Sequence, residues 1–253
     1  MCCFSRPVIH VAGTRIFARK TDAKHQGLAY QMEFAADEDL AMILPIPVAE
    51  GTAENAVKFI NLEKYDDFFK DLKKGFPEPP TKSRGLVDGF GPKSNAAPRL
   101  VVEKVGAFEA SFVPTSADFD RLDPRFSIPR ATWDKIPLYK DYGFVVFKLA
   151  KGEKEVHPMA FSFPTRHPDK LFFPTVHIHD GEVHTKENFD HDLYCQVDRF
   201  LLDSLKGWRE SPQPASFFTD EKKTHGLING GDHVYLNRMH GVFKNEDVLV
   251  GTA

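Results

Sequence analysis

Residues 171–184 read Leu171-Phe-Phe-Pro-Thr-Val-His-Ile-His-Asp-Gly-Glu-Val-His184, and this stretch predicts a β-hairpin. Asp180-Gly181 is a pair typical of two-residue hairpin turns, because both central residues of such a turn need positive φ. The flanking residues are β-branched or aromatic, as in strands. A hairpin here indicates a protein built mainly from antiparallel β-structure.

The register of this hairpin follows by counting outward from the turn. Directly opposed residues share a face, and successive residues along a strand alternate between faces. The opposed pairs are His179 with Glu182, Ile178 with Val183, and His177 with His184. One face would therefore carry three imidazoles and a carboxylate, and the other an apolar pair directed towards a core.

His177, His179, Glu182 and His184 form the candidate metal site. Imidazole suits Zn, Cu, Fe and Ni, and a carboxylate completes a four-coordinate or open site. Zn and Cu are favoured as cofactors, with Fe as a further candidate. In an enzyme, Glu182 would be the catalytic residue, acting as a ligand or a general base.

Two other interpretations of the histidines stay open. The first is a solvated hairpin face that is rich in histidine, and the second is an acid–base site without metal. His191 and His157 are candidates for additional or supporting groups. His10, His225, His233 and His240 are expected to be structural.

Composition excludes several classes of function. The chain has 253 residues and a net charge of −3, which does not favour a nucleic-acid partner. It has no apolar run of roughly 20 residues, so no membrane association is expected. No secretory signal is visible and only three cysteines occur, which predicts a cytoplasmic protein without a disulfide framework.

Strand patterns dominate the rest of the chain. They occur at 7–18, 28–34, 40–48, 100–114, 142–149, 156–163 and 233–239. The pattern predicts one α+β domain over residues 1–253, mainly antiparallel β (a sandwich or a large twisted sheet) with a few short flanking helices. We expect the 156–163 strand to pair with the 142–149 strand. The Pro/Gly-rich residues 75–99 predict a mobile loop, and a boundary between two domains is the less favoured alternative.

Helices or helical turns are expected at five places, two of which are short turns at 116–122 and 129–136. Residues 63–75 place Tyr65, Phe68, Phe69 and Leu72 on one apolar face, and Gly75 suits the C-cap. A short turn is expected at 52–60. Asp192 is a suitable N-cap for a helix ending near Gly207, with a strand at 193–197 as the competing interpretation.

Two segments resemble a known family. Cys3-Phe-Ser-Arg-Pro-Val8, Arg15-Ile-Phe-Ala18 and Leu40-Ala-Met-Ile-Leu-Pro-Ile-Pro-Val48, followed by Val156-His-Pro-Met-Ala-Phe-Ser-Phe-Pro164, resemble the bacterial domain-of-unknown-function family 2330. The resemblance covers roughly residues 2–48 and 141–176. It implies a related fold and transfers no activity, and it does not include the histidine-rich hairpin.

Cys2 and Cys3 provide a second candidate site. Removal of Met1 would turn Cys2 into an N-terminal nucleophile that uses its own amine as the base. Buried structural thiols in the first strand are the simpler interpretation. Soft-metal binding by Cys2 or Cys3, together with Cys195, is the third.

Three functions therefore follow from the sequence. The first is a soluble β-rich metal-binding protein, or a metalloenzyme of undefined substrate, with a mononuclear site on the 177–184 hairpin. The second is a non-enzymatic protein-interaction or self-assembly module that presents aromatic strands and the 75–99 loop; a homo-oligomer is compatible with it. The third is an N-terminal cysteine hydrolase.

Overall fold

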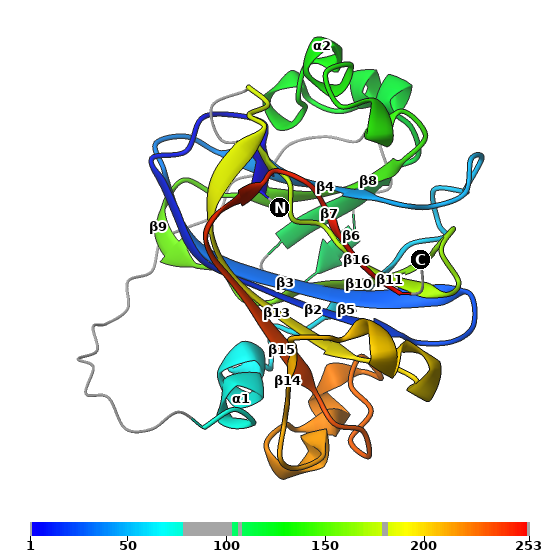
Figure 1. Cartoon of the computed structure of the whole chain (residues 1–253). Coiled ribbons are helices and arrows are strands. Elements are labelled where there is room, and N and C mark those ends of the chain that lie inside the picture. The colour runs from blue at the N-terminus through cyan, green and yellow to red at the C-terminus, as the bar shows by residue number, and fades with distance from the viewer. Residues whose placement is uncertain (1, 78–102, 106–107, 179–181, 252–253) are drawn as a thin grey trace.

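Two large β-sheets face each other, and most of the apolar side chains lie between them (Figure 1). This computed structural model describes residues 2–77, 103–105, 108–178 and 182–251. Strands account for most of the regular structure, and the helices are short. The expected β-rich α+β fold is confirmed.

The first sheet has six strands, and its centre is built from apolar sequence. In spatial order they are β12 (His177–Ile178), β1 (Cys2–Phe4), β4 (Leu40–Ile46), β8 (Gly143–Leu149), β7 (Phe108–Val113) and β6 (Glu103–Val105). The pairs are antiparallel except for β1 with β12, which run parallel. The N-terminal strand therefore lies beside residues 177–178.

The second sheet has eight strands. The path is β14 (Arg209–Glu210), β15 (Tyr235–Lys244), β13 (Lys186–Gln196), β2 (His10–Lys20), β3 (His25–Ala36), β10 (Met159–Pro164) and β5 (Lys58–Asn61), and β9 (Gly152–Glu155) pairs with β3. β13 runs parallel to β2 and antiparallel to β15. A separate pair joins β11 (Lys170–Phe173) to β16 (Val248–Gly251).

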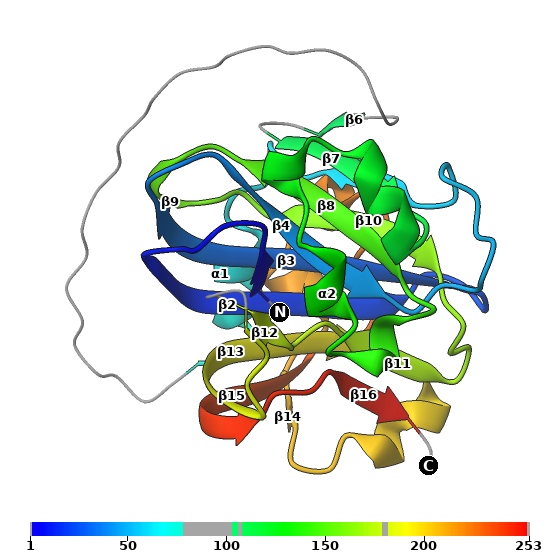
Figure 2. The same cartoon turned by 90° about the horizontal axis from the view of Figure 1, so that it is seen from above.

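Short helices cover the outer faces of both sheets. The helical turns between residues 116 and 139, including α2 (Arg130–Trp133), lie over the six-stranded sheet (Figures 1 and 2). The helix α1 (Phe68–Lys74) lies against the outer face of the eight-stranded sheet, next to the segment that follows β14. A second apolar cluster fills this outer layer, separate from the core between the sheets.

α1 confirms the helix expected from the apolar spacing from Phe68 onward, whereas residues 63–67 form turns in place of its first part. Phe68, Phe69 and Leu72 are buried, as the i, i+1 and i+4 positions of one face require. Gly75 follows the helix with a right-handed backbone conformation, so glycine is not needed here for a positive φ. A Cβ at this position would lie 2.6 Å from the ring of Phe218. Gly75 thus allows close packing of α1 against the 209–234 segment.

The helix expected over 192–207 is wrong for its first five residues. They belong to β13, and a 3₁₀ turn, η4 (Arg199–Ser204), follows. Leu193 and Cys195 pack into the core between the sheets, whereas Tyr194 packs into the outer layer. A strand that is covered on both faces has apolar residues at every position, and this pattern also satisfies a four-residue helical spacing.

Two other expectations need correction. Residues 58–61 form β5 at a sheet edge in place of a helical turn at 52–60. β10 pairs with β3 and β5 in the eight-stranded sheet, not with β8. Pro45 pairs with Phe144 of β8 and lies beyond Met42 and Ile43, the β4 residues that pair with β1.

Candidate functional site

His177 lies in the interior of the protein and its backbone is held on two sides. Its strand, β12, pairs with β1, in the register Cys2 with His177 and Cys3 with Ile178. The His177 N–H donates to Asn245 Oδ1 at 2.6 Å, and Asn245 Nδ2 donates to the His177 carbonyl at 2.9 Å. The Asn245 side chain therefore makes the two backbone hydrogen bonds that a neighbouring strand would otherwise make.

Asp247 fixes the chain just before β12. Its Oδ1 accepts the backbone N–H groups of Thr175 and Val176 at 2.8 and 3.2 Å. Its Oδ2 accepts the hydroxyl of Tyr139 at 2.6 Å. Burial raises the pKa of the Asp247 carboxyl and that of the Tyr139 hydroxyl. These contacts are structural, because they position His177 without reaching its ring.

The imidazole of His177 faces that of His191, from the middle of β13. Their Nε2 atoms are 2.9 Å apart, and the side chains are 3% and 0% exposed. Phe189 contacts both rings, with centroid distances of 4.4 Å to His177 and 5.0 Å to His191. His177 was expected to face the other candidate ligands of the hairpin. Its ring instead faces His191 of β13.

The other expected ligands have different surroundings. Glu182 is exposed and forms an ion pair with Lys135 Nζ at 2.6 Å. His184 is exposed, and its carbonyl accepts Asn245 Nδ2 at 3.0 Å. His179 lies outside the described residues, together with Asp180-Gly181, so the hairpin turn and its metal site stay predictions. Among the described residues, no group of three His, Cys, Asp or Glu side chains is placed to hold a metal ion.

His191 was recognisable from sequence only as an accessory group. If residues 186–196 are taken as a strand, Phe189, His191 and Leu193 share its core face. The helix expected over 192–207 breaks this alternation, so the sequence pattern assigned His191 no place in the core. His157, the other accessory candidate, packs against Phe108 with ring centroids 4.2 Å apart. Burial lowers the pKa of His157.

The described cysteines suit a structural role. Cys3 and Cys195 are free thiols, and both are completely buried. Burial raises the pKa of Cys195 well above its usual value, which disfavours the reactive thiolate. The proposed N-terminal nucleophile depends on Met1, which is outside the described residues, so that hypothesis stays a prediction.

A hollow of ligand size lies between α1 and the eight-stranded sheet. It has a volume of about 300 Å³ and is lined by Arg15, Glu33, Phe69, Lys70, Lys73, Asp192 and Tyr194. This volume is at the lower end for small-molecule pockets. Glu33 and Asp192 each have cationic neighbours, Arg15 at 3.6 Å and Arg238 at 3.7 Å respectively, so their charges are already partly compensated.

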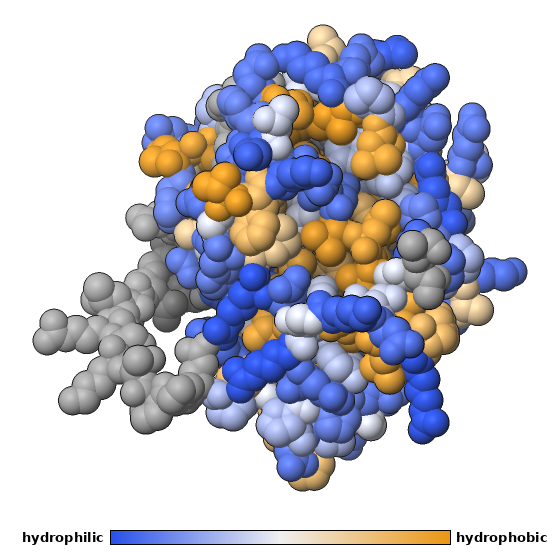
Figure 3. Space-filling view, in the orientation of Figure 1, coloured by the Kyte–Doolittle hydropathy of each residue, from blue (hydrophilic) through white to orange (hydrophobic). Residues whose placement is uncertain are grey.

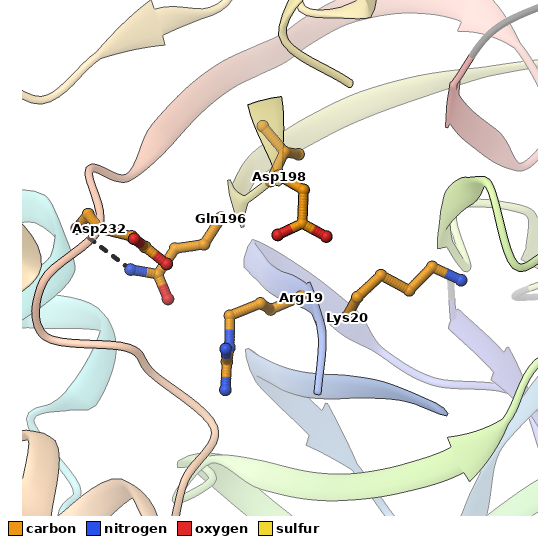
Figure 4. A pocket seen from close by; sticks show the side chains of 6 residues that line it. Arg19, Lys20, Gln196, Asp198 and Asp232 are labelled. Carbon is orange, nitrogen blue, oxygen red and sulfur yellow. Dashed lines mark hydrogen bonds between the residues drawn. The ribbon is translucent and has the colours of Figure 1, made fainter. Parts of the chain in front are cut away.

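A second hollow, at the ends of β2 and β13, is far smaller. Its volume is about 20 Å³, the space of one water molecule, and Figure 4 shows Arg19 and Lys20 on one side of it with Gln196, Asp198 and Asp232 around them. Arg19 donates to the carbonyls of Gly226 and Leu227 at 2.7 and 2.9 Å. The arrangement ties the 226–227 backbone to the sheet and leaves no space for a substrate.

Apolar side chains also reach the surface. In Figure 3, apolar residues gather in the middle of the face where Figure 1 places β11 and β16. Leu249 of β16 is 46% exposed, and Phe200 and Leu202 of the neighbouring η4 turn are 58% and 41% exposed. Exposed apolar side chains that lie together are typical of protein-contact surfaces.

The described part of the chain holds no helix that is long and apolar enough to cross a membrane. Comparison with protein-family models gives no match, and comparison with curated proteins gives none either. The resemblance to family 2330 therefore stays a prediction.

Solved structures do match, over nearly the whole chain. The crystal structure of baculovirus P35 superposes with a TM-score of 0.51 at 14% identity, covering 96% of this chain and 97% of P35. P35 in the crystal structure of the caspase-8/P35 complex superposes with a TM-score of 0.47 at 13% identity, covering 95% and 96%. A mutated baculovirus P35 after caspase cleavage gives 0.49 at 13% identity, with 96% and 100% coverage. At these identities the likeness is one of fold, and it is similarity to baculovirus P35 across both chains.

Proposed function

We propose that this protein is a protein-binding module whose partner is a protease of the caspase class. The observation that carries the proposal is the whole-chain similarity of fold to baculovirus P35. P35 itself has been crystallised in complex with caspase-8 and after caspase cleavage. Because the likeness spans both chains, it includes the elements on either side of the long connection between α1 and β6.

That connection supplies the chemistry a protease partner would recognise. Residues 78–102 contain prolines, glycines, lysines and a single aspartate, Asp88, which Gly89 follows. Caspases are cysteine proteases that cut after aspartate, so Asp88-Gly89 is the candidate bond. Binding residues commonly occur in connections that a rigid scaffold positions.

The scaffold on either side of the connection is well packed. Before it, Phe76 is 1% exposed, and Arg209 donates to the Pro77 carbonyl at 2.8 Å. After it, β6 pairs with β7 in the six-stranded sheet. The two ends of the connection therefore belong to fixed parts of the fold, which suits presentation of a segment to an enzyme.

Incubation with purified caspase-8 tests the proposal. We expect loss of caspase activity towards a short peptide substrate near one equivalent of protein, with intact-mass analysis showing cleavage between Asp88 and Gly89. Asp88→Ala should abolish both effects. Asp203→Ala, an exposed aspartate in η4, is the matched control and should leave both unchanged. Full caspase activity at a tenfold excess of intact protein would contradict the proposal.

A further inference from the structure

A buried pair of imidazoles joins two strands of the interior. His177 comes from β12, beside the N-terminal strand, and His191 from the centre of β13. Their Nε2 atoms are separated by 2.9 Å, and Phe189 packs on both rings. Neutral imidazole has one N–H, so at this distance one ring donates and the other accepts. Nε2 with its lone pair is also an atom by which neutral imidazole binds metal ions.

β15 brings a third donor to this pair. Met239 is the cross-strand partner of His191 in the antiparallel β13–β15 pair. Partners of this kind share a face, with Cβ atoms about 4.5–5.5 Å apart. Met239 is 8% exposed and belongs to the apolar cluster between the sheets. Its flexible thioether is therefore on the side of the sheet where the imidazoles meet.

We propose that His177, His191 and Met239 bind one copper(I) ion. Two imidazoles and a thioether are a soft donor set, and thioether favours Cu(I) over harder cations. The surroundings favour a single positive charge as well, because burying a charge in an apolar interior is costly and the cost rises with the charge. This assignment does not depend on protease binding.

The distances require only a small adjustment. Metal–nitrogen bonds of roughly 2 Å separate two ligating nitrogens by about 3–4 Å, depending on the angle between the bonds. The present separation of 2.9 Å is that of a hydrogen bond. A shift of the His177 ring by about 1 Å or less would make room for the ion, while Asn245 keeps the His177 backbone in place. The ring that donates its Nε2–H in the pair would carry that proton on Nδ1 instead, so that both neutral rings offer a lone pair at Nε2.

Copper(I) titration of tag-free protein under anaerobic conditions, in competition with a coloured Cu(I) chelator, tests the assignment. We expect one equivalent bound and X-ray absorption showing both nitrogen and sulfur neighbours. His177→Gln or His191→Gln should weaken binding by roughly 100-fold and Met239→Leu by roughly 10-fold, in the range that altered metal sites show. His240→Gln is the matched control, because this exposed histidine follows Met239 on β15 and lies on the other face, and it should have no effect. His184→Gln separates the proposed site from the one predicted on the 177–184 hairpin and should also leave the affinity unchanged.

Three results would overturn the assignment. The first is less than about a tenth of an equivalent of bound copper, and the second is unchanged affinity in the His177→Gln, His191→Gln double variant. The third is a loss with His184→Gln that equals the loss with His191→Gln, which would place the ion on the 177–184 hairpin. If the histidine variants fail to fold, the X-ray absorption of the native protein decides, because a spectrum without sulfur contradicts the role of Met239.

Discussion

The two faces of the eight-stranded sheet are covered in different ways. Its inner face meets the other sheet, and strands supply nearly all of the core between them. Its outer face is covered by α1 and by the 209–234 segment, which apart from β14 has only short 3₁₀ turns. Backbone hydrogen bonds hold part of this irregular cover, such as the bond from the Ala215 N–H to the Asp232 carbonyl at 2.9 Å, and side chains supply others.

Those side-chain bonds are visible throughout the outer layer. Gln196 donates to the Asn229 carbonyl at 2.7 Å and accepts the Asn229 N–H at 2.9 Å. Tyr65 accepts the backbone N–H of Asp220 at 2.8 Å. The inner core should therefore be sensitive to lost volume, and the outer layer to single polar or steric changes.

The largest effect is expected for Phe161→Ala in the inner core. Phe161 is completely buried, and its ring lies 6.1 Å from that of Phe147 and 5.9 Å from that of Phe163. Loss of the ring should lower the free energy of unfolding by about 3–5 kcal/mol, measured by urea denaturation. Phe217→Ala, at a 72% exposed position, should change it by less than about 0.5 kcal/mol. Equal losses of unfolding free energy in the Phe161→Ala and Phe217→Ala variants would show that burial in the inner core does not set the cost.

Gly75→Ala tests the contact between α1 and the 209–234 segment. The new Cβ would meet three atoms of the Phe218 ring at 2.6–2.9 Å, so the ring or the helix must move. We expect destabilisation of about 1–3 kcal/mol, with hydrogen exchange accelerated in the outer layer before the inner core. Gly231→Ala, where the nearest atom is 3.6 Å away, is the control. Uniform acceleration in both layers would show that they unfold together.

Tyr65→Phe removes one polar contact from the same layer. The Tyr65 hydroxyl donates to Asp71 Oδ2 at 2.9 Å as well as accepting from Asp220. Loss of both bonds should cost about 1–2 kcal/mol in the free energy of unfolding. Tyr235→Phe, which removes an exposed bond to Glu210, should cost less than about 0.5 kcal/mol. A cost below that of the control would show that the Asp220 N–H finds another acceptor.

The smallest expected effect is a pH dependence at Lys20. Partial burial at the end of β2 lowers the pKa of its ammonium to about 8, whereas the unfolded chain has its ordinary value near 10.5. The unfolded state therefore binds more protons between pH 8 and 10.5, so stability should rise with pH across this window. Solvent screening keeps the change below about 1 kcal/mol. Lys20→Gln should flatten this part of the pH profile of urea midpoints, and an unchanged profile would exclude Lys20.

How an element is covered also determines whether the sequence reveals it. α1 has apolar residues on one face only, so its period was clear. The end of β13 is covered on both faces, and its continuous apolar residues Leu193, Tyr194 and Cys195 resembled the start of a helix. The partner of β10 could not be inferred, because strand pairing between distant segments leaves no local pattern.

The candidate site also has residues that the sequence indicates and residues that only the fold brings together. The sequence pointed to His177 through its place near a turn signal, but its neighbour His191 depends on β12 and β13 meeting in space. Met239 is placed opposite His191 by the β13–β15 register, and a single buried methionine in a strand gives no signal of its own in the sequence. The role proposed for residues 78–102 rests on comparison of folds, since composition alone predicted only a loop.

The pairing of β1 with β12 has a consequence for biosynthesis. Residues 2–4 are made some 175 residues before their parallel partner. At about 5–20 residues per second, this interval lasts roughly 10–35 s. Before residues 177–178 exist, β1 can pair with β4 but not with β12, so completion of this sheet edge is a late step of folding.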